Sequence, residues 1–172
     1  LSPLHYISDN YLFSAHMLQH VLLTLLAPPL IIFGIPDQAI NKCLNVPFLS
    51  NIAKSLTNPI VAFMSFNLTF SIWHMPQLYH YSVSLHWVHV VEHLMFVLTA
   101  ILMWWPIASR SRLLPKLSYP LRISYLFFLS IAQIIVFGMI TFSNNPLYDW
   151  YINAPRLFGI SAMLDQQIGG II

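Results

Sequence analysis

Charge is the scarcest feature of this sequence. Its 172 residues include seven lysines and arginines and five aspartates and glutamates, so that 7% are charged whereas 58% are hydrophobic. A soluble domain carries about a quarter charged residues, and the composition therefore predicts an integral membrane protein. The formal net charge is only +2 and the basic residues are scattered, which argues against a nucleic-acid-binding surface.

Cysteine is nearly absent as well. Cys43 is the only one, so the sequence allows no disulfide within the chain and no cluster of thiolates. This argues against a structural zinc site and against an iron–sulfur site. The sequence has eight histidines and seven methionines instead. Any metal site would therefore depend on imidazole, thioether or carboxylate ligands.

Hydrophobic runs are what the sequence has in excess. A helix needs about twenty apolar residues to cross a bilayer. The runs predict an all-α integral membrane protein, a bundle of four complete transmembrane helices and the start of a fifth, in a single domain over residues 1–172. We expect it to be part of a longer bundle. The expected spans are about 14–33, 59–74, 84–105, 119–142 and 157–172.

Proline and glycine predict local features of these spans. Pro28 and Pro29 lack the N–H that a helix interior needs, so the first span should kink near them. Pro106 should end the third span. Gly169 and Gly170 should allow the last helix to approach a neighbour closely.

The connections between the spans are less regular. Residues 1–13 are polar and aromatic and are predicted to form a loop, and residues 77–83 a short re-entrant stretch. Between the first two spans, Asp37 could cap one short surface helix, and Ser50 or Asn51 another.

Basic residues lie mainly in two connections. One follows the first span and the other follows the third, while the connection between the second and third spans has none. The residues are Lys42, Lys54, Arg110, Arg112, Lys116 and Arg122. Cytoplasmic loops carry the excess of Lys and Arg in membrane proteins. The sequence therefore predicts a multi-pass membrane protein, with the histidine-bearing helix ends on the extracytoplasmic side.

The third expected span carries groups that a membrane helix normally avoids. Its first half contains His86, His89, Glu92 and His93, and its second half has no charge. Steps of three and four residues place the three imidazoles on one stripe of a helix with about 3.6 residues per turn. Ionisable groups in a membrane span face a cavity or a partner, so this stripe is a candidate site.

Other helix ends supply possible partners. His16 and His20 lie one turn apart on the first span, His74 ends the second, and Asp165 lies at a similar depth in the fifth. Helical bundles build metal sites from side chains on facing helices, and imidazole with carboxylate suits copper, zinc or iron. The predicted metal ligands are His16, His20, His74, His89, His93 and Asp165, with Glu92 and His86 as supporting residues.

Each of these residues also has a simpler interpretation. A single histidine at a helix end, such as His74 or His86, is commonly an interfacial hydrogen-bonding group. Asp165 could instead cap a break at Gly169-Gly170, or act behind the ligands rather than as one of them. The pairs His16/His20 and His89/His93 are harder to explain as packing.

The run from His89 to His93 also matches H-x-x-E-H, the inverted zinc-protease signature. In that motif two histidines bind zinc and the glutamate acts as the base. The match is short, and an apolar membrane span continues directly after it. An intramembrane zinc metalloprotease is therefore the weakest of the alternatives.

Several longer segments resemble one protein family. They are HMLQH (16–20) followed by APPL, WHMPQLY (73–79), EHLMFVLTAILMWWPI (92–107), PLYDWY (146–151) and LDQQIGG (164–170). In this order, over nearly the whole chain, they resemble the multi-span CtaG-type assembly factors of caa-type cytochrome c oxidase. The resemblance implies a bacterial plasma-membrane protein needed to mature a haem–copper oxidase, through copper.

From the residues and the resemblance together, we expect a copper-binding assembly factor that helps deliver copper to the oxidase subunits and catalyses no reaction. Its other surroundings would be the lipid bilayer, and no nucleic acid. One alternative is a haem carrier or b-type membrane cytochrome with His20 and His93 as axial ligands. Another is a scaffold that binds no metal.

Overall fold

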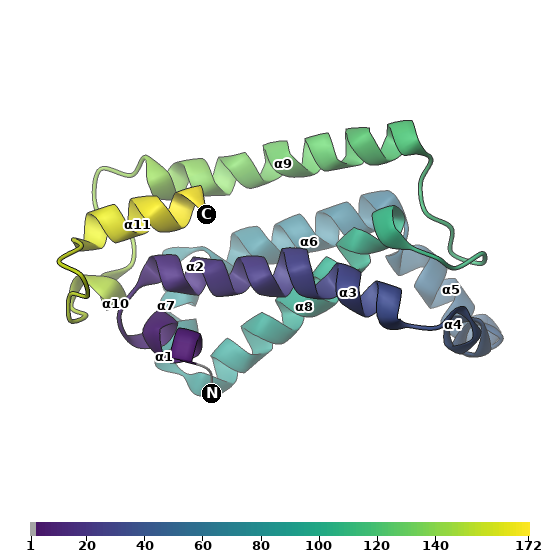
Figure 1. The fold of residues 1–172 in the computed structure, drawn as a ribbon, viewed down its shortest axis with the longest axis horizontal. Coiled ribbons are helices and arrows are strands. Elements are labelled where there is room, and N and C mark those ends of the chain that lie inside the picture. The colour runs from purple at the N-terminus through teal and green to yellow at the C-terminus, as the bar shows by residue number, and fades with distance from the viewer. Residues whose placement is uncertain (1–2) are drawn as a thin grey trace.

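The computed structural model describes residues 3–172, and this range is helical with no strand. Three helical segments are long and apolar enough to cross a membrane: Phe13–Gly34, His86–Ala108 and Tyr119–Thr141. A shorter apolar helix, Pro59–Trp73, has 15 residues. The predicted all-α membrane fold is confirmed at this level (Figure 1).

The first spanning segment is divided into three elements, each of the other two is a single helix, and the shorter apolar helix is a further element. They are α2 (Phe13–Val21), η1 (Leu22–Leu26), α3 (Ala27–Gly34), α6 (Pro59–Trp73), α8 (His86–Ala108) and α9 (Tyr119–Thr141). The remaining helices are α1 (Pro3–Asn10), α4 (Asp37–Leu44), α5 (Pro47–Leu56), α7 (Pro76–Ser84), α10 (Asp149–Ile152) and α11 (Ala162–Ile171).

Some local features differ from the predictions; α5, for example, begins at Pro47 and is not capped by Ser50 or Asn51. Residues 3–10 form helix α1 rather than a loop. The segment packs along α2, and its own composition gives no sign of that packing. Residues 76–84 form helix α7, which Pro76 begins in its first turn. Helix α8 continues past Pro106 to Ala108, and near its end Tyr125 donates to the carbonyl of Met103 and the N–H of Leu117 to that of Pro106.

The first span was predicted to kink near Pro28 and Pro29, and its helical geometry changes directly before them. The chain forms the π-helical turn η1 directly before them, inside the first span. Neither proline can donate to the carbonyl of Thr24, and the indole Nε1 of Trp104 on α8 donates to it instead, at 2.8 Å. A neighbouring helix thus satisfies the backbone group that the prolines leave open, as membrane helices require.

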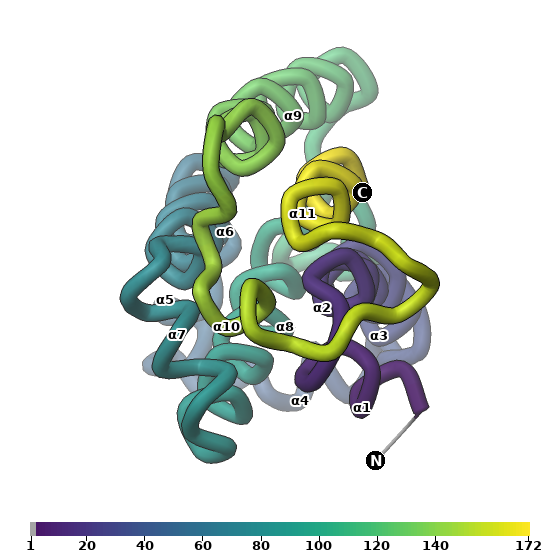
Figure 2. Tube along the Cα trace, turned by 90° about the vertical axis from the view of Figure 1, so that its left-hand side faces the viewer, coloured from purple at the N-terminus to yellow at the C-terminus, as the bar shows by residue number. Residues whose placement is uncertain are grey.

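Helix α8 lies among the other helices. It packs against α6, α7, η1 and α3, and α6 and α8 share an apolar core that includes Phe66, Phe96 and Met103. Helix α11 lies between α2 and α9 (Figure 2). A Cβ at Gly169 would overlap the ring of Phe13, and one at Gly170 would overlap Thr141, so the predicted close approach is confirmed.

The bundle has two dissimilar ends (Figure 1). We call the end that carries α4, α5 and the 109–118 loop the basic end, because five of the seven basic residues lie there: Lys42, Lys54, Arg110, Arg112 and Lys116. The opposite end, formed by α1, α7, α10 and the first turns of α2 and α8, is called the histidine end.

Candidate metal centre

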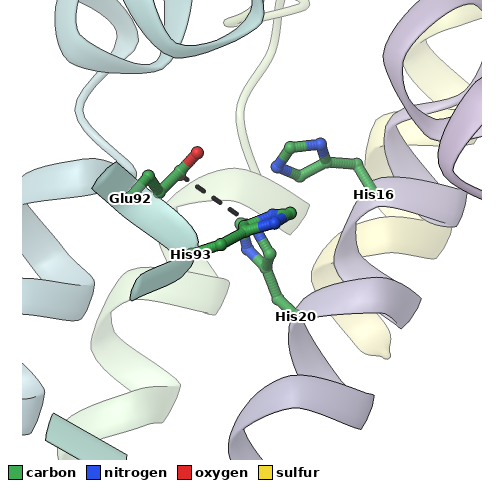
Figure 3. A group of neighbouring side chains, drawn as sticks. All are labelled: His16, His20, Glu92 and His93. Atoms are coloured by element: carbon green, nitrogen blue, oxygen red, sulfur yellow. Dashed lines mark ion pairs between the residues drawn. The ribbon is translucent and has the colours of Figure 1, made fainter. Parts of the chain in front are cut away.

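Four side chains from two facing helices converge at the histidine end. His16 and His20 come from α2, and Glu92 and His93 from α8 (Figure 3). Each offers one possible ligand atom, and these atoms lie within 4.8 Å of one another. His16 and Glu92 are 0% exposed and His20 is 2% exposed. We call these four residues the inner group.

Helix geometry explains why the four meet. His16 and His20 are one turn apart, and their rings lie 4.2 Å apart between centroids. The ring of His93 lies 5.3 Å from that of His20 and 6.2 Å from that of His16, again between centroids. The structure therefore brings together both members of the predicted pair His16/His20 and one member, His93, of the predicted pair His89/His93.

The inner group contains buried polar atoms without partners. Both ring nitrogens of His16, both ring nitrogens of His20 and Oε1 of Glu92 have no hydrogen-bond partner. Nε2 of His20 and Oε1 of Glu92 are 4.0 Å apart. Leaving a buried polar atom unpaired costs about 1–3 kcal/mol, and native proteins rarely do so. Several such atoms around one point are the pattern of a ligand set for a cation.

Glu92 has a more direct position than the sequence indicated. It was predicted as a supporting residue, yet its Oε1 faces the imidazoles. Its other oxygen, Oε2, accepts a short hydrogen bond from Ser82 on α7, which fixes the carboxylate. Ser82 is fully buried and nothing in the sequence singled it out. Its role depends on α7 being a helix that packs on α8.

His74 lies beside the inner group. Its Nδ1 is 2.7 Å from the carbonyl oxygen of Phe70, so that Nδ1 carries the hydrogen and donates it. The Nε2 of His74 is therefore a bare acceptor, and it is buried and unpaired. Metal-binding histidines are commonly held in this way, with the other ring nitrogen bonded to a carbonyl. The ring lies 5.7 Å from that of His20 between centroids.

His89 adjoins the inner group but belongs to a second set. Its Nε2 is hydrogen-bonded to Nε2 of His93 at 3.0 Å. Together with His5 and Asp9 of α1 it offers three possible ligand atoms within 4.8 Å of one another. We call His5, Asp9 and His89 the outer group. Sequence reasoning did not bring His5 and Asp9 to this place, because they lie in the segment predicted to be a loop.

Asp165 lies elsewhere than predicted. Its carboxylate caps the start of α2: Oδ2 accepts from the backbone N–H of Phe13 at 2.6 Å, and Oδ1 from the N–H and hydroxyl of Ser14 at 3.1 and 2.5 Å. With both oxygens engaged, Asp165 positions the helix that carries His16 and His20. His86, the other predicted supporting residue, is exposed and belongs to neither group.

Buried phenols close the site from the side of the short helices. Tyr79 packs 5.1 Å from the ring of His16 between centroids, and its hydroxyl donates to that of Tyr151, which in turn donates to the carbonyl of Ser8. Burial raises the pKa of Tyr79 and of Tyr151 well above its ordinary value. Both remain neutral hydrogen-bond donors, which ties α7, α10 and α1 together around the imidazoles.

The inner group fits a metal ion with a small adjustment. Metal–imidazole bonds are near 2 Å, so four ligand atoms arranged tetrahedrally on one ion lie about 3.3 Å apart, and the present separations of up to 4.8 Å would shorten by up to about 1.5 Å. Three imidazoles and a carboxylate without thiolate suit copper, zinc or iron. The group can hold a metal, and its residue types leave the identity of the metal open.

Comparison with known proteins gives a family. The family model described as cytochrome c oxidase caa3 assembly factor (Caa3_CtaG) matches residues 1–172. Uncharacterized proteins of Mycobacterium bovis and Mycobacterium tuberculosis are each 27% identical over 177 residues, which is 92% of this chain and 26% of the relative. One of Mycobacterium leprae is 25% identical over 179 residues, or 94% and 27%. The chain thus spans about a quarter of these relatives. No solved structure matches it.

Proposed function

The chain belongs to the cytochrome c oxidase caa3 assembly factor family, and on that premise we propose that it binds copper at the inner group and assists its delivery to a haem–copper oxidase during assembly. The observation that carries the proposal is the set of unpaired buried nitrogens on His16 and His20, facing Glu92 and His93. Such a set is costly unless a ligand occupies it.

The ligand chemistry supports copper in transit. A neutral imidazole costs less to bury than a charged group, so a metal site inside a membrane bundle favours histidine. The carboxylate of Glu92 offsets part of the charge of the ion. Without thiolates, the site need not hold copper so tightly that transfer to another protein fails. His74 offers one further ligand atom, its unpaired Nε2, on a ring that lies 5.7 Å from that of His20 between centroids.

The surrounding residues would have positioning roles. Ser82 holds the Glu92 carboxylate and Asp165 holds the start of α2. Trp104 holds the π-helical turn η1 that follows α2. In the proposal these groups hold the ligands and the helices in place, and the family is one of assembly factors. We therefore assign the chain no reaction of its own.

The orientation that we propose follows the basic residues. The basic end faces the cytoplasm and the histidine end the extracytoplasmic side of a bacterial plasma membrane. In this arrangement α6 is a fourth span, short but apolar, and α11 opens a fifth, within one domain over residues 1–172. Copper would then arrive from outside the cell.

Haem is the next candidate, and the geometry disfavours it. A haem between His20 and His93 needs a slot as wide as a porphyrin between the two rings. The rings of His16 and Phe96 pack against His20 at 4.2 and 4.7 Å between centroids and fill the space beside it. A purified protein without a Soret band would agree with this argument.

The test compares two histidines of one helix, His93→Ala and His86→Ala. His93 is in the inner group, whereas His86 is exposed and outside both groups. We expect His93→Ala to lose stoichiometric copper at the inner group and to leave the oxidase without its copper, and His86→Ala to behave as wild type. The measurements are the copper content of the purified variants and of the oxidase from cells that carry them. Full metallation of the oxidase with a normally folded His93→Ala protein would overturn the proposal in favour of a scaffold.

A further inference from the structure

The outer group has the composition of a second metal site. His5 and Asp9 are one turn apart on α1, and Nε2 of His5 lies 3.3 Å from Oδ2 of Asp9. The third member comes from another helix: Nδ1 of His89 on α8 lies 4.0 Å from Oδ1 of Asp9. An ion pair within α1 explains the first of these contacts. It does not explain why a second imidazole points a ring nitrogen at the same carboxylate.

Exposure distinguishes the outer group from the inner one. The side chains of His5 and Asp9 are 16% and 24% exposed, whereas those of His20 and Glu92 in the inner group are 2% and 0% exposed. The outer group is therefore the part of the histidine end that an ion from solution reaches first. His89 lies between the two, with 5% of its side chain exposed.

The two groups are in direct contact. His89 and His93 are hydrogen-bonded through their Nε2 atoms at 3.0 Å, and their rings lie 4.3 Å apart between centroids. The ring of His89 also lies 5.4 Å from that of His16. An ion bound between His5, Asp9 and His89 is thus about one imidazole width from the ligands of the inner group.

His5 is oriented for ligation by its neighbours. Its Nδ1 lies 3.2 Å from the side-chain amide of Gln19 on α2, and the same amide lies 2.9 Å from the hydroxyl of Ser8. The amide nitrogen of Gln19 donates to Nδ1 of His5, and the amide oxygen accepts from the Ser8 hydroxyl. Gln19 thus fixes the ring through Nδ1, and Nε2 of His5 is the ring nitrogen on the side of Asp9.

We propose that the outer group is a second copper site, through which copper enters and passes to the inner group. This inference rests on the proposed function, because it assumes that the inner group binds copper. Transfer is ligand exchange: His89 of the outer group releases the ion and His93 of the inner group accepts it. No electron is transferred. Asp9 supplies the negative charge that a partly exposed site needs to attract a cation.

The test counts copper ions on the whole chain. The protein in lipid nanodiscs is dialysed to equilibrium against Cu(II) buffered with glycine, and copper per chain is measured by mass spectrometry. We expect two equivalents for the wild type and one for the double variant His5→Gln/Asp9→Asn, which keeps side chains of similar size. The matched control is His80→Gln/Asp149→Asn, which removes an exposed histidine and an exposed aspartate at the same end and should keep two equivalents.

Each other outcome decides the matter. A single equivalent in the wild type, or two in His5→Gln/Asp9→Asn, overturns the outer site and leaves the proposed function standing. Loss of both equivalents in that folded variant shows one shared site and also overturns the assignment. A wild type that binds no copper under these conditions removes the proposed function itself, and the outer site with it.

Discussion

At the histidine end, buried side chains tie three short helices to the spans, whereas at the basic end two short helices rest on a narrow apolar strip. Tyr79 and Tyr151 link α7, α10 and α1, and Trp150 donates to the carbonyl of Asp9 at 2.8 Å. At the other end, α5 has no buried residue and α4 packs mainly through Ile40 and Leu44.

The difference matches the roles that we propose for the two ends. A set of metal ligands works only when its atoms are held within a fraction of an ångström, so the histidine end needs buried contacts and satisfied donors. The basic end needs only to carry positive charge on one side of the membrane. Charge at the membrane surface acts over a Debye length of about 8 Å. Exact placement of Lys42 or Lys54 therefore gains little.

The largest predicted effect concerns which side each end occupies. Cys43 is exposed on α4 at the basic end. We expect an impermeant thiol reagent to leave it unlabelled in right-side-out vesicles and to label it after permeabilisation. The matched variant, Cys43→Ser/His80→Cys, moves the thiol to exposed α7 at the histidine end and should be labelled from outside at once. The reverse pattern would invert the orientation of the whole bundle.

The next effect compares one carboxylate from each end. Glu92→Gln keeps the shape but replaces the charged oxygen of the inner group by a neutral amide. We expect copper affinity to fall at least about 100-fold, the upper end of the cost of disturbing groups around a metal. Asp37→Asn, an exposed carboxylate on α4, should leave the affinity unchanged. Competition titration with a copper chelator measures both, and equal affinities would remove Glu92 from the centre.

A smaller effect compares two glycines. A Cβ at Gly170 would overlap the Thr141 hydroxyl and lie 3.1 Å from the backbone nitrogen of Thr141, so α11 and α9 would have to separate. We expect Gly170→Ala to lower the free energy of unfolding by about 2 kcal/mol. A Cβ at Gly34, the last residue of α3, meets nothing within 4 Å, and Gly34→Ala should change stability by less than about 0.5 kcal/mol. Unfolding with sodium dodecyl sulfate in mixed micelles provides both values. Similar losses would mean that α11 does not pack closely.

The sequence predicted the spans and the pairing of helices better than the details of the centre. Apolar runs and histidine spacing depend on one helix at a time, and they placed His16, His20 and His93 on facing stripes. Glu92 illustrates the limit: counting turns gives its rotation about α8 but not that α7, with Ser82, packs beside it.

Asp165 and α1 illustrate the same limit. The predicted depth of Asp165 assumed a helix that begins near residue 157, whereas α11 begins at Ala162, so Asp165 lies in the first turn and meets the start of α2. Helix α1 forms because it packs on α2, and a polar, aromatic segment of eight residues gives no periodic signal of that packing. The outer group could not be predicted without it.

The smallest predicted effect compares two adjacent tryptophans, one bonded to the middle of the first span and the other to the loop of the basic end. Trp104 donates to the carbonyl of Thr24 in the π-helical turn, whereas Trp105 donates at 3.3 Å to the carbonyl of Leu114 in the loop of the basic end. The carbonyl of Leu114 also accepts from the Ser109 hydroxyl at 2.6 Å, so it keeps a partner when the indole is removed.

Both indoles are half-buried, and Trp104→Phe and Trp105→Phe remove the same volume. Only the first leaves a backbone carbonyl unpaired inside the bundle, because Pro28 and Pro29 have no N–H to offer Thr24 in its place. We expect Trp104→Phe to cost about 1 kcal/mol more than Trp105→Phe in the same unfolding assay, the usual value of one hydrogen bond. Equal costs would mean that this carbonyl finds another donor, and that the turn carrying the histidine helix past its prolines does not depend on α8.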